Sequence, residues 1–178
     1  MSDERDPSTG FRVAPAPGPG LRTDVIDAYV FRRAVSANAE SPEFLLLRRA
    51  GRPLAGTWQP VMGHIESGET AVQTAARELR EEIALDVTDA GACVGFWQLE
   101  QVYPFFLAEI DAVVCSPRFA VEVTPAWSPT LNDEHEDWKW IRERTDFLWP
   151  GQRLALDEIV ECLLPREAPT RTALAVRP

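Results

Sequence analysis

Hydrophobic and polar residues recur along this chain with two periods, one typical of strands and one typical of helices. Short runs rich in aliphatic and aromatic residues predict strands at 24–32, 44–49, 58–61, 85–88, 92–98, 105–115 and 138–141. Segments 70–84 and 153–164 instead repeat their apolar residues every three or four positions, which predicts two helices. Long strands with two clear helices indicate an α/β protein in which both faces of a mixed sheet are covered.

The first predicted helix has one apolar face and a well-formed beginning. Its apolar stripe must pack against a core, and it consists of Val72, Ala75, Ala76, Leu79 and Ile83. Thr70 and Gln73 have the spacing of a capping box, so we expect the helix to begin near Thr70.

Beside this stripe the same helix carries three carboxylates, Glu78, Glu81 and Glu82, within about one third of its circumference. Like charges four residues apart repel by a few tenths of a kcal/mol, roughly, and the negative end of the helix dipole adds to that cost. A divalent cation would remove both penalties. Mg²⁺ is the natural candidate, with Mn²⁺ as the alternative, because it bridges carboxylates to substrate phosphates.

The segment from residue 63 to residue 85 resembles the signature of the Nudix hydrolases. That signature reads Gly, five residues, Glu, seven residues, then Arg-Glu-apolar-any-Glu-Glu-any-Gly-apolar. The chain meets it at Gly63, Glu69, Arg77, Glu78, Leu79, Glu81, Glu82 and Leu85. Ala84 stands where the signature has glycine, so we expect a slightly different turn at the end of the helix. The resemblance implies an α/β/α sandwich with a mixed central sheet.

The resemblance also implies roles for individual residues. Arg77 is expected to orient the glutamates, and Glu69 is expected to brace the loop against the helix. Glu78 and Glu134 both remain candidates for the catalytic base. The expected metal ligands are the carbonyl of Gly63 and the side chains of Glu78, Glu81, Glu82 and Glu134.

Residues outside the signature bear on the substrate. Trp58-Gln59, Glu134-His135 and the segment 138–141 resemble the bacterial dihydroneopterin triphosphate pyrophosphatase branch. That branch implies release of pyrophosphate from a pterin or deoxynucleoside triphosphate. Diadenosine tetraphosphate hydrolases have similar Glu-His-x-x-Trp endings and a tyrosine near the position of Tyr103, and they are the first alternative. A Nudix protein that binds a nucleotide without hydrolysing it is the second, although no expected carboxylate is missing.

Three further residues are candidates for substrate binding. Arg48 and Arg49 close a predicted strand, and an arginine fork matches phosphate oxygens, although surface charge is the plainer interpretation. Trp58 precedes the metal-binding loop and offers a face on which a base or a pterin can stack.

Composition limits the organisation and the partners of the chain. Its 178 residues suffice for one domain, which we place at 21–164, between a Pro- and Gly-rich disordered tail at 1–20 and a loose C-terminal tail at 165–178. The net charge of −10 disfavours a nucleic-acid polymer and leaves a small polyphosphate as the expected partner.

Targeting signals and cysteines add little to this picture. No apolar run approaches the roughly 20 residues of a membrane span, and the N-terminus lacks a secretory pattern. We therefore expect a cytoplasmic protein that does not enter a membrane. The three cysteines lack metal-site spacing and are expected to be reduced. The family resemblance implies a monomer or a homodimer.

Overall fold

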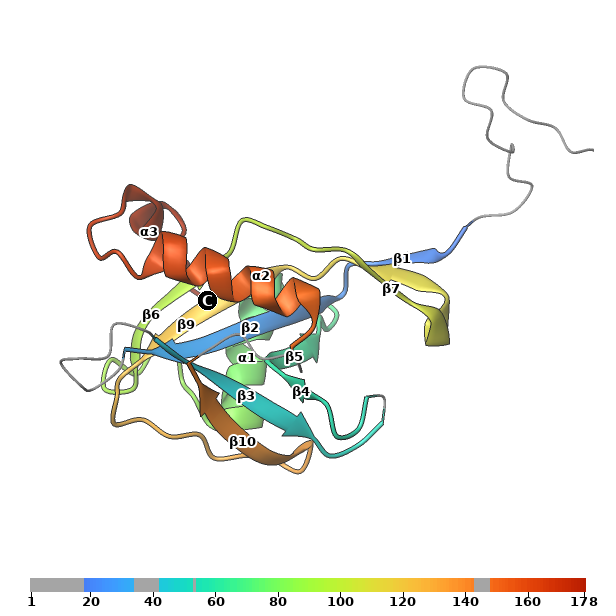
Figure 1. The fold of residues 1–178 in the computed structure, drawn as a ribbon, viewed down its shortest axis with the longest axis horizontal. Helices are drawn as coiled ribbons and strands as arrows, with labels where there is room; N and C mark the ends of the chain where they lie inside the picture. The colour runs from blue at the N-terminus through green and yellow to red at the C-terminus, as the bar shows by residue number, and fades with distance from the viewer. Residues whose placement is uncertain (1–17, 34–41, 53, 143–147) are drawn as a thin grey trace, which may run out of the picture.

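A mixed β-sheet forms the centre of the protein (Figure 1). The computed structural model describes residues 18–33, 42–52, 54–142 and 148–178. The sheet has the order β10-β3-β2-β9-β6, with β4 paired to β3 and β5 paired to β2. Among the described strand pairs of this sheet, β2 and β9 run parallel and the others antiparallel, so the predicted mixed sheet is confirmed. The strands are Val25–Arg32 (β2), Glu43–Arg49 (β3), Trp58–Gln59 (β4), Val61–His64 (β5), Cys93–Gln98 (β6), Arg118–Val123 (β9) and His135–Ile141 (β10).

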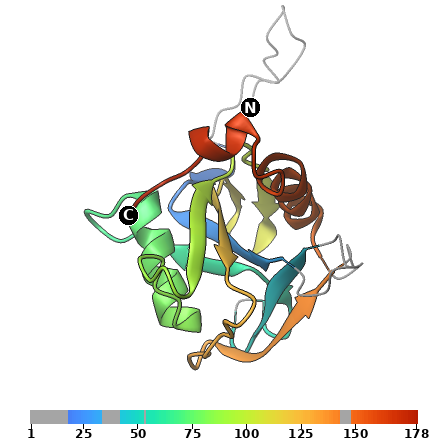
Figure 2. The same cartoon turned by 90° about the vertical axis from the view of Figure 1, so that its left-hand side faces the viewer.

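Helices cover the two faces of this sheet, as Figures 1 and 2 show. Helix α1, Ala71–Ile83, lies on one face, and α2, Pro150–Glu158, lies on the other and continues as a π-helical turn, η2. A smaller sheet joins β1, β8 and β7. The remaining elements are Gly20–Arg22 (β1), Phe105–Leu107 (β7), Ala108–Ile110 (η1), Ala112–Val114 (β8), Ile159–Leu163 (η2) and Pro169–Ala173 (α3).

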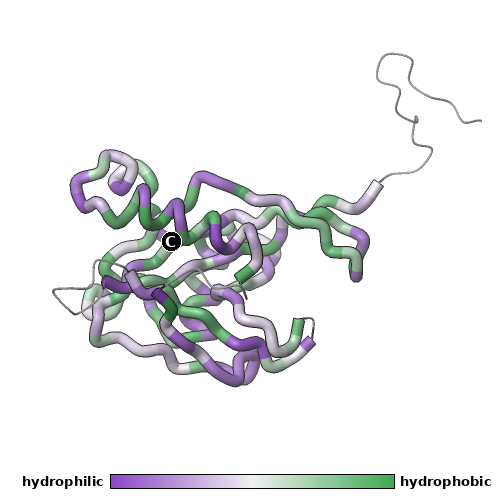
Figure 3. The backbone as a smooth tube through the Cα atoms, viewed as in Figure 1, coloured by the Kyte–Doolittle hydropathy of each residue, from purple (hydrophilic) through white to green (hydrophobic). Residues whose placement is uncertain are grey.

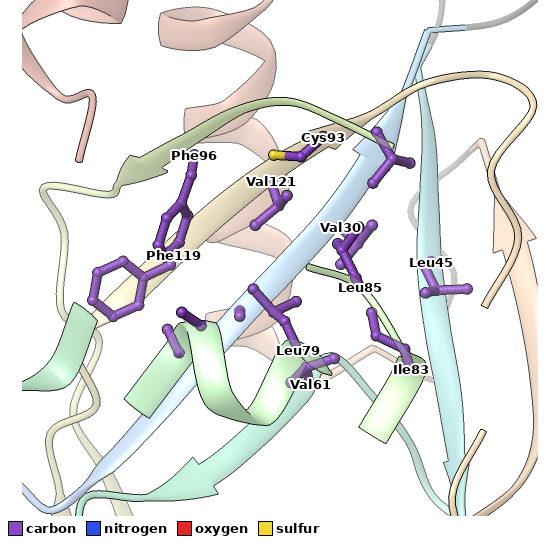
Figure 4. Packing of buried hydrophobic residues seen from close by; sticks show 14 of the residues in the cluster. Val30, Leu45, Val61, Leu79, Ile83, Leu85, Cys93, Phe96, Phe119 and Val121 are labelled. Atoms are coloured by element: carbon purple, nitrogen blue, oxygen red, sulfur yellow. The ribbon is translucent and has the colours of Figure 1, made fainter. Parts of the chain in front are cut away.

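The first helix forms as its sequence predicts. Thr70 caps it, and Gln73 completes the capping box, because each side chain bonds the other residue's backbone N–H. The apolar stripe is buried: Leu79 and Ile83 pack into a core with Val30 and Val121 of the sheet (Figure 4). This packing fixes the rotation of α1 and places the carboxylate of Glu78 beside Gly63 of β5.

A second core lies between the opposite face of the sheet and α2. Phe31, Leu46 and Trp97 from the strands pack with Ala155 and Leu156 of the helix. Along α2 the hydropathy alternates, as expected of a helix with one buried face (Figure 3). The sheet is therefore buried on both sides, which makes the arrangement an α/β/α sandwich.

The structure corrects several predicted elements. Residues 85–88 form a turn rather than a strand, because the side chain of Asp86 accepts hydrogen bonds from both the backbone and the hydroxyl of Thr88. Pro60 lacks an N–H and separates β4 from β5 within 58–61. The predicted strand 105–115 is broken by η1 and by the left-handed Asp111. The second helix begins three residues before the predicted residue 153.

Strand β9 was not predicted, although all six of its residues are buried. Two charged side chains, Arg118 and Glu122, interrupt its apolar pattern. Glu122 is buried only because Arg33 and Arg171 both pair with it, at 2.8 Å and 2.7 Å. Those partners come from distant parts of the chain, so the local pattern does not reveal them.

Within the expected C-terminal tail, residues 169–176 contact the rest of the protein. Arg171 stacks over the ring of Trp97 at 4.2 Å, and the indole N–H of Trp97 donates to the carbonyl of Arg171. Ala175 forms a bridge to the same tryptophan. Residues 1–17 of the expected N-terminal tail lie outside the described residues, and Gly20 belongs to β1. The domain boundaries at 20 and 164 remain predictions.

Ala84 adopts the left-handed conformation that a glycine would adopt, with φ 55° and ψ 33°. Its N–H bonds the carbonyl of Arg80, so the turn keeps the glycine form and stores strain. We expect Ala84→Gly to stabilise the protein by about 1 kcal/mol, which corresponds to a rise in Tm of roughly 2–4 °C. Thermal unfolding measures this. Ala71→Gly, in the right-handed first turn of α1, should lower Tm. A lower Tm for Ala84→Gly would contradict the inference that Ala84 is strained.

Candidate active site

A cleft of about 520 Å³ opens beside α1 and is lined by five of the ten predicted site residues. Gly63 enters it from β5, and Arg77 and Glu78 enter from α1. Arg49 arrives at the end of β3, and Glu134 arrives from the loop before β10. Among these residues, Arg49 and Glu134 are 85 positions apart in the sequence, and the fold brings them to one cleft.

Arg77 holds the acidic residues in position. Its guanidinium donates to both carboxylate oxygens of Glu69, at 2.9 Å and 3.1 Å, and to the carbonyl of His64. One of its nitrogens, Nη1, also donates to Glu78 at 2.7 Å and to Glu81 at 3.1 Å. Hydrogen bonding to Arg77 lowers the pKa of Glu69 to about 2. Glu69 therefore stays ionised and links the loop to α1 through Arg77 and Thr74.

Glu82 is the least satisfied acidic group of the site. Its side chain is 1% exposed, and neither oxygen accepts a well-formed hydrogen bond from the described residues. Burial, together with the negative charges of Glu78 and Glu134, raises its pKa to about 9. A buried carboxyl without a partner is costly, and a cation beside it would remove that cost. The residues therefore fit the metal that the family resemblance implies.

Gly63 and Glu78 approach each other closely. A Cβ atom built on Gly63 would lie 2.0 Å from the carboxylate of Glu78, so no residue larger than glycine fits beside this side chain. Burial raises the pKa of Glu78, against the opposing effect of the Arg77 guanidinium. The glycine thus lets a largely buried carboxylate and a backbone carbonyl share one corner of the cleft.

Glu134, at the end of the loop before β10, and His135, the first residue of β10, lie at the same corner. The side chain of Glu134 is 54% exposed, and its nearer oxygen lies 3.8 Å from Nη1 of Arg49. His135 is fully buried, and its Nδ1 lies 3.8 Å from Glu82. Burial, together with the positive charge of Arg49, lowers the pKa of His135 to about 4, so the ring is neutral at pH 7. Nε of Arg49 is buried without a partner among the described residues.

Besides Glu69 and Glu82, three predicted site residues lie outside the cleft lining, and their side chains make other contacts. Arg48 points along the sheet and pairs with Glu136 at 3.1 Å. The Trp58 ring is covered by the ammonium group of Lys139 at 3.8 Å. Glu81 is on the exposed side of α1, where it contacts Arg77. Their roles in binding substrate or metal remain predictions that the cleft geometry does not support.

Sequence reasoning missed a second pocket, of about 100 Å³, that shares Leu54, Gln59, Met62 and Phe105 with the cleft. Asp27 and Arg118 lie in its wall, both 5% exposed. One signal was present: Asp27 is a charged residue within an otherwise buried strand. A carboxylate in such a strand indicates a partner or a ligand.

The carboxylates do not form a closed shell by themselves. Among residues 18–33, 42–52, 54–142 and 148–178, no three His, Cys, Asp or Glu side chains already stand around a common metal position. Mg²⁺ keeps several waters and uses one or two carboxylates together with substrate phosphates. An open, partial ligand set beside a cleft is therefore the expected form of such a site. Within the part of the chain that the structure describes, no helix has the length and apolar character needed to cross a membrane.

Comparison with known proteins agrees with this geometry. The model of the NUDIX domain family matches residues 30–148. The asymmetrical bis(5'-nucleosyl)-tetraphosphatase of Sus scrofa is 30% identical over 122 residues, which cover 63% of this chain and 74% of the relative. The dihydroneopterin triphosphate diphosphatase of Haemophilus influenzae is 34% identical over 107 residues, covering 54% of this chain and 63% of the relative, less than two thirds of its length.

Solved structures show the same fold. The MutT protein of Methanosarcina mazei superposes with a TM-score of 0.61 at 20% identity, covering 82% of this chain and 97% of that chain. Together, the sandwich, the glutamate-bearing helix and the cleft define the class of the protein as a hydrolase that acts on phosphoric anhydrides. The chain belongs to the Nudix family.

Proposed function

We propose that this protein is a Mg²⁺-dependent pyrophosphohydrolase that cleaves a diphosphate linkage in a small nucleoside, deoxynucleoside or pterin triphosphate and releases pyrophosphate. The observation that carries the proposal is the buried, unpartnered carboxyl of Glu82 beside a cleft that also holds Glu78, Arg49 and Glu134. Such a set can bind a cation and a polyphosphate together, because the cation offsets both sets of negative charge.

The residues of the cleft have distinct proposed tasks. Glu82, Glu78 and the carbonyl of Gly63 hold the cation, which supplies charge neutralisation at the phosphate oxygens when bound. Arg77 keeps Glu78 in place through the 2.7 Å hydrogen bond. Arg49, with its unpartnered Nε, binds a phosphate oxygen through its guanidinium.

Glu134 is the proposed general base. Its side chain is half exposed in the cleft, whereas Oε1 of Glu78 already accepts a hydrogen bond from Arg77. A water oxygen forms a bond to phosphorus while the bond from phosphorus to the leaving phosphate oxygen breaks, and the carboxylate of Glu134 accepts the water proton.

Dinucleoside polyphosphates are the second candidate substrates. The relative from Sus scrofa carries that activity in its name and has the larger coverage of the two relatives described above. The same cleft would hold the central phosphates of such a substrate. The two candidates differ in what is released, pyrophosphate in one case and a nucleoside triphosphate in the other.

Product analysis with a substrate panel tests the proposal. Purified full-length protein is incubated with GTP, dATP, dihydroneopterin triphosphate and diadenosine tetraphosphate, in Mg²⁺ and in EDTA. We expect turnover only with the metal, with pyrophosphate as the product from the triphosphates. Release of ATP from diadenosine tetraphosphate at the highest rate of the panel would favour the second candidate. No turnover of any substrate in Mg²⁺ or Mn²⁺ would contradict hydrolysis.

A further inference from the structure

The second pocket adjoins the catalytic cleft along β4 and β5. The two hollows share Leu54, Gln59, Met62 and Phe105, so a ligand can extend from one into the other. The metal side of this path is acidic, and the far side is largely apolar. A polyphosphate ester of a planar ring likewise has two parts, a charged polyphosphate that suits the metal side and a flat ring that suits the apolar side.

Aromatic side chains form the walls of the pocket. Phe105 and Trp149 meet edge to face, with ring centroids 6.3 Å apart, and Tyr103 stands beside them. Tyr103 and Trp149 are each about two fifths exposed, so their rings are accessible from solvent. A planar heterocycle can stack on such faces.

The deepest residues of the pocket are polar and lack well-formed partners. Asp27, Arg118 and Gln59 are 5%, 5% and 4% exposed. Oδ1 of Asp27, Nε and Nη1 of Arg118 and Nε2 of Gln59 form no well-formed hydrogen bond with the described residues. Asp27 and Arg118 face each other at 3.6 Å, which is an ion pair without a hydrogen bond. Buried polar groups are normally bonded, so these atoms indicate a ligand.

Gly151 of α2 keeps room for this arrangement. A Cβ atom built on it would lie 2.8 Å from Nη2 of Arg118 and 2.9 Å from Cδ1 of Tyr103. Any larger residue would push the guanidinium and the aromatic wall. The first turn of α2 therefore leaves the polar group and the stacking face side by side.

We propose that this pocket binds the ring of the substrate and that Asp27 and Arg118 select a 2-amino-4-oxopyrimidine edge, which guanine and pterins share. In that edge, a ring N–H and an amino group lie next to each other and match the two oxygens of a carboxylate. The adjacent carbonyl accepts from arginine. Adenine presents an acceptor nitrogen where the carboxylate needs a donor. The inference rests on the proposed function of the neighbouring cleft.

Selectivity for the ring tests this assignment. Values of kcat/KM are measured for GTP, ITP, ATP and dihydroneopterin triphosphate, where ITP lacks only the 2-amino group of GTP. We expect GTP or the pterin to exceed ITP and ATP by about tenfold or more, since a buried polar site rejects analogues that leave it unpaired. Comparison of kcat/KM for GTP with that for dihydroneopterin triphosphate shows whether the pocket prefers the guanine ring or the pterin ring.

Asp27→Asn supplies the residue-level test. The amide keeps the shape but replaces one acceptor by a donor, so kcat/KM for the preferred substrate should fall at least tenfold while that for ATP changes less than twofold. Asp24→Asn, the same change in an exposed carboxylate paired with Arg22, should leave the ratio unchanged. Gly151→Ala provides a second variant that retains the buried carboxylate and should also reduce the preference. Unchanged ratios in both pocket variants would overturn the proposal.

Binding without turnover separates this inference from the proposed function. Tryptophan fluorescence in EDTA reports nucleotide binding near Trp149, and we expect a lower Kd for GTP than for ITP or ATP. Hydrolysis in Mg²⁺ with equal Kd and kcat/KM values for GTP, ITP and ATP would overturn the pocket assignment and leave the proposed hydrolase function intact. Selective binding of GTP in EDTA with no turnover in Mg²⁺ would support the pocket assignment and contradict the proposed hydrolase function.

Discussion

Glu82→Gln will lower Mg²⁺-dependent turnover by at least about 10³-fold, because loss of a metal ligand removes several kcal/mol of transition-state stabilisation. Glu82 is the buried carboxyl whose oxygens lack well-formed partners, so a neutral amide there offers the cation one weak oxygen in place of a negative charge. The measurement is kcat with the best substrate of the panel. Near-wild-type turnover in Mg²⁺ would contradict the assignment of the metal site.

The same substitution should stabilise the protein when metal is removed. Burial raises the pKa of Glu82 to about 9, so the folded protein binds a proton that the unfolded chain releases above its ordinary carboxyl pKa. Stability from this group is therefore present at low pH and is lost as pH rises toward about 9, by up to about 1.4 kcal/mol per pH unit. Glu82→Gln removes that loss, so in EDTA at pH 8 its Tm should exceed that of the wild type.

Addition of Mg²⁺ should reverse this order of Tm values. Mg²⁺ replaces the proton on Glu82, so it should raise the Tm of the wild type more strongly as pH increases, and it should raise the Tm of the variant little. Glu161→Gln changes an exposed glutamate of η2 on the other side of the sheet, and it should alter neither turnover nor the metal response. A variant that is inactive and also unstable in EDTA would point to a folding defect rather than to a lost ligand.

The helix at the site could be predicted from the sequence, because its capping box, apolar stripe and carboxylates are all local features. Thr70 begins it, and Leu79 and Ile83 face the core as their spacing requires. The end of the helix also shows the limit of a local signature. Ala84 departs from the glycine of the pattern, yet it adopts the same left-handed turn, because the packing of Leu85 at 0% exposure holds the chain there.

Long-range contacts explain what the sequence could not show. Strand β9 carries Arg118 and Glu122, which interrupt its apolar pattern, and their partners Asp27 and Arg171 lie 91 and 49 positions away. The pocket formed by Asp27 and Arg118 depends on the parallel pairing of β2 with β9, and periodicity does not reveal strand order. For the same reason, Arg49 but not Arg48 could be assigned to the cleft only once the sheet was known.

Gly63→Ala should lower turnover by about 10²-fold or more while leaving the fold intact, because a displacement of about 1 Å at a catalytic group is enough for such a loss. The added Cβ would lie 2.0 Å from the carboxylate of Glu78, and the Glu78 side chain, rather than the backbone, is the part that can move. Its movement would break the 2.7 Å hydrogen bond from Arg77 and withdraw an oxygen from the cleft. Turnover and Tm are measured together, and Gly51→Ala, where a Cβ meets open space, should change neither.

A double-mutant cycle identifies how Gly63→Ala acts. If the methyl group works by displacing Glu78, then adding Gly63→Ala to Glu78→Ala should cost little further activity, since the group it displaces is already absent. Fully additive losses would instead mean that the backbone of β5, and with it the carbonyl of Gly63, had shifted. The comparison therefore separates the two contributions of this corner to the metal site, a side-chain oxygen from α1 and a main-chain oxygen from β5.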